Sequence, residues 1–208
     1  RPEKRNALSP QLIEELLAAL DAVEAASAIR VLILTGEGQA FCSGMDLEYL
    51  KGLAGQSAEQ NLADARRTVR MFRRLWSFPK PVITAVNGPA LAGGCGIATL
   101  GDFTLASEEA KFGYTEVRVG FMPALISAFL QMQVGEKVAR DLLLSGRVFG
   151  AADDLRVCPI SHVPSRKTET ATSGLAAVAV YPISMCFVVV EPGFIDYRRK
   201  IHALLRTA

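Results

Sequence analysis

Residues 80–102 read KPVITAVNGPALAGGCGIATLGD, and the other elements of the chain are interpreted from this segment. It opens with an apolar, β-branched run, Val82–Val86, which is typical of a buried strand. A turn, residues 87–89, follows it. Three glycines then precede a segment that is compatible with a helix: Gly93, Gly94 and Gly96. Glycines beside a helix start let a phosphate, a carboxylate or a developing oxyanion approach backbone N–H donors, although they also serve simple close packing.

A second stretch repeats this plan earlier in the chain. Val31–Thr35 (VLILT) is another buried-strand pattern. A glycine-containing loop, residues 36–40, leads from it into the run FCSGMDL at residues 41–47. Two strand–loop–helix units of this kind predict an α/β protein.

Four motifs follow one another along the first three quarters of the chain. They are RPEKRNAL (residues 1–8), GEGQAFCSGMDL (36–47), KPVITAVNGPALAGGC (80–95) and AKFGYTEV (110–117). Together they resemble the crotonase, or enoyl-CoA hydratase/isomerase, superfamily. The resemblance implies a spiral of stacked ββα units with a C-terminal helical part. We expect a crotonase-like core at residues 1–153 and a divergent C-terminal segment at residues 154–208.

Local patterns predict the helices of the core. Ser9 and Pro10 are a good helix start, and apolar residues at helical spacing continue to Val23. We also expect a short helix at residues 47–53, a flexible loop at 52–60 and a helix at 61–76. From Ala124 to Leu144 the apolar periodicity is again helical.

Composition excludes several classes of protein. A length of 208 residues suits one domain, and a formal charge of +2 gives no argument for nucleic-acid binding. Two distant histidines, His162 and His202, form no metal signature. Residues 170–190 are uncharged, but Pro182 interrupts them, so we expect no membrane span. Four cysteines without a C-x-x-C pair favour free thiols in a reducing, cytoplasmic setting: Cys42, Cys95, Cys158 and Cys186.

The resemblance also implies a reaction. The backbone N–H groups of Met45 and Gly93 would form an oxyanion hole for a thioester enolate, and Glu116 would transfer the proton. Family hydratases commonly carry a second glutamate where this chain has Gly96, so hydration and double-bond isomerisation both remain open. The implied substrate is an acyl-CoA, with no further cofactor, and the implied assembly is a homotrimer or hexamer. The implied thioester contacts are Lys4, Arg5, Ala7, Ser43, Met45, Asp46, Leu47, Gly93 and Gly94.

Other interpretations compete with this one. On residue type alone, Glu116 is a solvated loop carboxylate, and Asp46 serves equally well as a helix cap. A dinucleotide-binding oxidoreductase is suggested by Gly36 and Gly38, but the third fingerprint glycine is replaced by Phe41. A non-catalytic acyl-CoA-binding paralogue is the main alternative.

Overall fold

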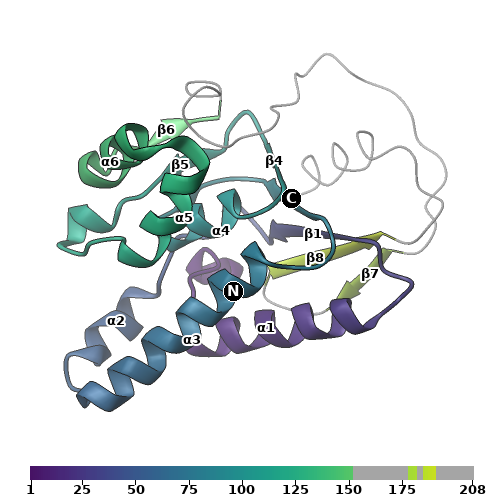
Figure 1. Cartoon of the computed structure of the whole chain (residues 1–208), viewed down its shortest axis with the longest axis horizontal. Coiled ribbons are helices and arrows are strands. Elements are labelled where there is room, and N and C mark those ends of the chain that lie inside the picture. Colours follow the sequence, from purple (N-terminus) through teal and green to yellow (C-terminus); the bar gives the residue numbers. More distant parts are fainter. Residues whose placement is uncertain (152–177, 182–184, 191–208) are drawn as a thin grey trace.

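The computed structural model describes residues 1–151, 178–181 and 185–190, and its centre is a five-stranded sheet (Figure 1). The strand order is β4-β2-β1-β8-β7, with β1, β2 and β4 parallel and β8 antiparallel to β1. The strands are β1 (Val31–Gly36), β2 (Val82–Val86), β4 (Phe103–Ala106), β7 (Val178–Tyr181) and β8 (Met185–Val190). Every residue of β1 and β2 is buried, as their continuous apolar runs predict.

A three-stranded sheet carries the glycine-rich turn. Its order is β3-β5-β6, formed by β3 (Ala90–Leu91), β5 (Lys111–Gly113) and β6 (Phe149–Gly150). Helix α4 (Gly93–Thr99) starts two residues after β3 and packs on β2 and β4. The α/β class is therefore confirmed. The expected C-terminal helical part and the domain boundary at residue 153 lie outside the described residues.

Helices α1 (Pro10–Ala25) and α3 (Ala58–Trp76) lie side by side (Figure 1). Ion pairs join them at Arg67–Glu14 (2.8 Å) and Arg74–Asp21 (2.7 Å). A second group comprises α5 (Ala124–Val134) and α6 (Glu136–Ser145), which contact each other. Shorter helices are η1 (Pro2–Lys4), α2 (Leu47–Leu53) and η2 (Glu116–Val119). No helix in the described ranges is long and apolar enough to cross a membrane.

Helix starts follow their capping residues. The Ser9 side chain accepts a hydrogen bond from the N–H of Leu12, which confirms the predicted start of α1. Helix α3 starts earlier than the predicted residue 61, because Ser57 and Gln60 form a capping box. The expected loop at residues 52–60 is correspondingly shorter.

The helical pattern of residues 124–144 is divided in the structure. Gly135 has φ +78° and separates α5 from α6, so the chain changes direction there. Periodicity did not reveal this break, because the apolar residues on either side keep a helical spacing. A glycine within a helical pattern was the available signal.

An asparagine fixes the loop that follows β1. Asn87 accepts a hydrogen bond from the N–H of Gly36 (3.2 Å) and donates one to the carbonyl of Gly38 (2.9 Å). From the other side, Asn6 donates to the carbonyls of Glu37 (2.9 Å) and Ala40 (2.8 Å). These two side chains therefore satisfy backbone groups that form no ladder of their own.

We expect Asn87→Ala to lower the free energy of unfolding by about 2 kcal/mol, because it leaves a part-buried N–H and a carbonyl unpaired. Urea unfolding of the purified protein measures this change. The control is Gln11→Ala on the exposed face of α1, where we expect a change within about 0.5 kcal/mol. Equal stability of Asn87→Ala and the wild type would contradict the role of Asn87.

Candidate active site

The turn at residues 42–46 is held between two other segments. On one side, Cys42 donates its N–H to the carbonyl of Pro89 (3.2 Å) and accepts the N–H of Leu91 (2.9 Å). On the other side, the N–H of Leu8 bonds to the carbonyl of Gly44 (2.8 Å), and Leu8 in turn accepts the N–H of Asp46 (3.0 Å). Three motifs that lie far apart in the sequence thus meet at one place.

Two backbone donors are left over at this meeting point. Within the described part of the chain, neither Met45 nor Gly93 has a hydrogen-bond acceptor for its N–H. The two lie on neighbouring backbones, since a Cβ built on Gly44 would lie 3.3 Å from the nitrogen of Gly93. Unpaired N–H groups on adjacent segments are the donors that a ligand oxygen requires.

Backbone strain marks the entry to α4. Ala92 has φ 51° and ψ −128°, outside the regions that residues with a side chain ordinarily occupy. The N–H of Ala92 bonds to the carbonyl of Gly113 (2.7 Å), and its carbonyl accepts the N–H of Gly96 (3.1 Å). Strain of this kind costs of order 1–3 kcal/mol and concentrates at functional sites. Here it sets the orientation of the peptide that carries the Gly93 N–H.

The glycines of α4 serve different purposes. A Cβ on Gly94 would lie 2.2 Å from the carbonyl oxygen of Cys42, so the fold itself requires glycine there. A Cβ on Gly93 would meet Leu8 at 3.5 Å and Phe72 at 3.9 Å, which are ordinary contacts. The packing of the described residues therefore does not demand glycine at position 93.

Glu116 begins η2 and has a half-buried side chain. Its Oε2 is buried and has no hydrogen-bond partner among the described residues. Burial raises the pKa of this carboxyl above its ordinary value of 4.5, against a smaller lowering by its own N–H. Its charge also acts on Cys95 of α4, where it helps burial to raise the pKa of the thiol to about 12. Glu116 thus lies near α4 with one carboxyl oxygen, Oε2, that has no hydrogen-bond partner among the described residues.

Apolar side chains occupy the space beside Gly96. A Cβ there would lie 2.7 Å from Cδ1 of Ile126 and 3.2 Å from Cε1 of Phe72. Ile126 comes from α5 and Phe72 from α3, and they are only 3% and 4% exposed. Neither residue is predictable from the sequence, because no local pattern marks a side chain that packs across three helices. The position therefore has neither a carboxylate nor room for one.

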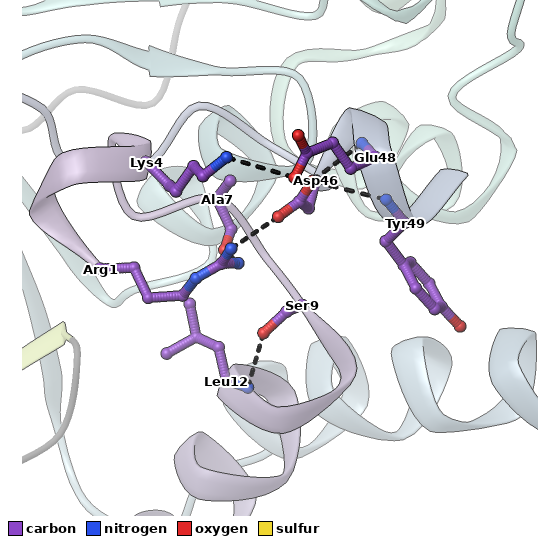
Figure 2. Close-up of polar contacts among 8 residues, drawn as sticks. All are labelled: Arg1, Lys4, Ala7, Ser9, Leu12, Asp46, Glu48 and Tyr49. Atoms are coloured by element: carbon purple, nitrogen blue, oxygen red, sulfur yellow. Dashed lines mark hydrogen bonds and ion pairs between the residues drawn. The ribbon is translucent and has the colours of Figure 1, made fainter. Parts of the chain in front are cut away.

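Asp46 has a structural role, because both of its carboxyl oxygens are hydrogen-bonded within the protein. Its Oδ1 accepts the N–H groups of Glu48 (2.9 Å) and Tyr49 (3.5 Å) and so caps α2 (Figure 2). Its Oδ2 bonds to Arg1 (2.7 Å), whose guanidinium also donates to the carbonyl of Ala7 (2.9 Å). The hydrogen bond from Arg1 lowers the pKa of Asp46, and the backbone bonds add to this effect. Capping is one of the two roles that the sequence allows for this residue.

The remaining predicted contacts surround the same turn. Lys4 pairs with Glu48 across 3.2 Å (Figure 2), and Arg5 is left-handed with its carbonyl bonded to the N–H of Ser43 (3.0 Å). Leu47 is 59% exposed. The structure thus brings residues 4–8, 43–47 and 93–94 together. Glu116 lies close enough to Cys95 of α4 for its charge to act on that thiol.

Among the described residues, neither Cys42 nor Cys95 is placed for thiolate chemistry. Cys42 and Cys95 are free and buried, and burial raises the pKa of each thiol to about 12, so both are protonated at neutral pH. Within the same residues, no group of three or more histidine, cysteine, aspartate or glutamate side chains is arranged to hold a metal ion.

Known proteins share this sequence and arrangement. The sequence profile of the Enoyl-CoA hydratase/isomerase family matches residues 1–177, which extends past residue 153. A Thermus thermophilus protein with the provisional name enoyl-CoA hydratase is 47% identical over 152 residues, covering 73% of this chain and 60% of that protein. A Rhizobium meliloti protein named "Probable enoyl-CoA hydratase" is 36% identical over 194 residues, covering 92% and 74%.

Solved structures agree with the sequence relatives. A crystal structure of an enoyl-CoA hydratase from Shewanella pealeana superposes with a TM-score of 0.75 at 34% identity, covering 79% of this chain and 62% of that one. The chain thus spans about three fifths of the length of the Thermus and Shewanella proteins. The crotonase-like fold predicted from the motifs is confirmed, and the chain belongs to the enoyl-CoA hydratase/isomerase family.

Proposed function

We propose that the chain belongs to an acyl-CoA enzyme that acts on a 2- or 3-enoyl thioester through an enolate-like intermediate. The observation that carries this proposal is the pair of unpaired N–H groups on the adjacent segments of Met45 and Gly93. A thioester carbonyl oxygen becomes negative when a proton leaves the α-carbon, and two fixed donors stabilise that charge. Loss of one such donor typically costs ~3–4 kcal/mol of transition-state stabilisation.

Glu116 is the proposed proton-transfer group. A general base works best when its pKa lies near the working pH, and burial moves the pKa of Glu116 upward, toward that range. Its buried Oε2 has no partner among the described residues, so it is available to a substrate. The alternative of a solvated loop carboxylate is disfavoured by this burial.

One carboxylate serves both reactions of the family name. Proton transfer from one carbon to another gives isomerisation, whereas hydration also requires a positioned water. Ile126 and Phe72 fill the space beside Gly96, so a second carboxylate from that position takes no part. The proposal includes both reactions: crotonyl-CoA is the substrate that tests hydration, and a 3-enoyl-CoA is the substrate that tests isomerisation.

The rest of the thioester contacts follow from the same turn. We propose that Lys4, Arg5 and Ala7 line the coenzyme A side, and that Ser43, Leu47 and Gly94 border the thioester. Asp46 contributes through its cap of α2 rather than by touching the ligand. For the whole protein, we also propose a homotrimeric or hexameric assembly and a cytoplasmic location. Coenzyme A is then part of the substrate and not a cofactor.

The names of relatives favour catalysis. Proteins at 35% and 38% identity are named crotonyl-CoA hydratase and 2,3-dehydroadipyl-CoA hydratase. The alternative of a non-catalytic acyl-CoA-binding paralogue has no support from these names, and an oxidoreductase has none either.

We expect Glu116→Gln to lower turnover at least ~100-fold on crotonyl-CoA or on a 3-enoyl-CoA, because an amide cannot accept the α-proton. Absorbance of the conjugated thioester follows both reactions. Glu109→Gln, an exposed substitution in the turn before β5, is the matched control and should retain activity. Full activity of Glu116→Gln would overturn the proposed base.

The same substitution should stabilise the protein at neutral pH. Burial raises the folded-state pKa of Glu116, so stability falls as the pH rises from the ordinary value of 4.5 through the raised pKa. Replacing the carboxyl by an amide removes that loss. Thermal unfolding should therefore show Glu116→Gln above the wild type at about pH 7, with the difference shrinking toward about pH 4. A difference that is independent of pH would contradict this assignment.

We expect Gly96→Glu alone to destabilise the protein, because its Cβ overlaps Ile126. The double variant Gly96→Glu/Ile126→Ala gives the new carboxyl room, and crotonyl-CoA hydration should rise roughly tenfold or more through a second acid–base group. Ile126→Ala alone is the control. A folded double variant that isomerises but hydrates no faster would show that position 96 does not face the reacting carbons.

A further inference from the structure

Helix α2 directly follows the turn that carries Met45, yet little apolar burial holds it in place. None of its seven residues is buried. Leu47 is 59% exposed, and Leu50 and Leu53 are only partly covered. A helix of this length is unstable by itself in water. Polar contacts must therefore keep α2 on the body of the protein.

The contacts at the start of α2 reach the opening loop. Asp46 caps the helix and bonds to Arg1, while Glu48 pairs with Lys4 (Figure 2). Both side chains of the Lys4–Glu48 pair are well exposed, and such pairs contribute little. These contacts fix the first turn of α2 to residues 1–8, and they leave the rest of the helix to other partners.

Two side chains link α2 to α3: Asn61 donates a long hydrogen bond from Nδ2 to the carbonyl of Leu53 at the end of α2 (3.4 Å), and Tyr49 makes the shorter contact. Its side chain points away from the Lys4–Glu48 pair (Figure 2), and its hydroxyl donates a hydrogen bond to Oδ1 of Asp64. Asp64 is only 9% exposed, and the same oxygen accepts Nη1 of Arg67 at 2.8 Å. Arg67 is held in turn by Glu14 of α1 (2.8 Å). Tyr49 thus bonds to a charged acceptor that two helices fix in place, which is the stronger class of hydrogen bond.

We propose that Tyr49 is a positioning residue, whose hydrogen bond to Asp64 keeps α2 docked on α3 and so keeps the N–H of Met45 beside that of Gly93. The chain offers no slack for independent movement, because Asp46 is both the residue after Met45 and the N-cap of α2. A shift of α2 therefore moves the backbone at residue 45. The last step of the proposal rests on the proposed function, whereas the docking of α2 does not.

The contact is constant across the working pH range. Burial and the adjacent Asp64 carboxylate raise the pKa of Tyr49 to about 12, so its phenol stays protonated and remains a donor. The role of Tyr49 is therefore one of position rather than of proton transfer.

The first test is independent of catalysis. Tyr49→Phe keeps the ring and removes only the hydroxyl, and Lys51→Gln changes an exposed residue of the same helix that has no ion pair among the described residues. Hydrogen exchange of the peptide that covers α2 should accelerate about tenfold or more in Tyr49→Phe, and it should be unchanged in Lys51→Gln. Urea unfolding records global stability, so that local opening is separated from general destabilisation. Unchanged exchange of α2 in Tyr49→Phe would overturn the proposal.

The second test uses enoyl-CoA kinetics. Bound thioester restores the docked state, so KM should rise roughly threefold to tenfold in Tyr49→Phe while kcat changes less than about twofold. Faster exchange with unchanged KM and kcat would overturn the link between α2 and Met45. If the wild-type protein neither binds nor converts enoyl-CoA, the proposed function fails, and hydrogen exchange still decides whether Tyr49 docks α2.

Discussion

The carbonyl oxygen of Cys42 lies where a side chain at position 94 would begin, and the rest of the site depends on this contact. The distance from that oxygen to a Cβ on Gly94 would be 2.2 Å, which only a glycine avoids. The close approach lets Leu91 donate its N–H to the same oxygen. It thereby sets the turn after β1 against the start of α4, and it brings the N–H groups of Met45 and Gly93 onto neighbouring backbones. Among the described residues, neither of those two N–H groups has an acceptor.

One half-buried carboxyl, that of Glu116, lies near the helix that Gly93 begins. Oε2 of Glu116 is buried without a hydrogen bond from the described residues. The carboxyl lies near α4, and Ile126 and Phe72 pack against that helix at Gly96. Such an arrangement disfavours the ionised form and lowers stability at neutral pH. Structural packing gives no reason to retain it. The proposed role of Glu116 in accepting and returning a proton gives a reason to retain it, since stability is commonly lower at functional sites.

Sequence patterns predicted the parts of the fold that local chemistry determines. The strands β1 and β2 follow from continuous apolar runs, and α1 follows from Ser9 and its apolar stripe. The motifs also placed Met45, Gly93 and Glu116 in one region, although their catalytic roles remain proposals. Contacts between distant segments could not be predicted. The packing of Ile126 on Gly96 and the bond from Tyr49 to Asp64 each join separate helices, and neither leaves a mark in the neighbouring sequence.

The N–H groups of Met45 and Gly93 are held in place by different kinds of interaction. Gly93 is placed by backbone alone, through the strained Ala92 before it and the close approach at Gly94 after it, and a side chain at position 94 would disturb that approach. Met45 is placed partly by side chains, because the helix that follows it is held by polar contacts and buries no residue. Backbone packing tolerates little displacement, whereas polar side-chain contacts can be exchanged one at a time. We infer that sequence changes in α2 can shift the backbone at Met45, while the N–H of Gly93 stays where the sheet and α4 hold it.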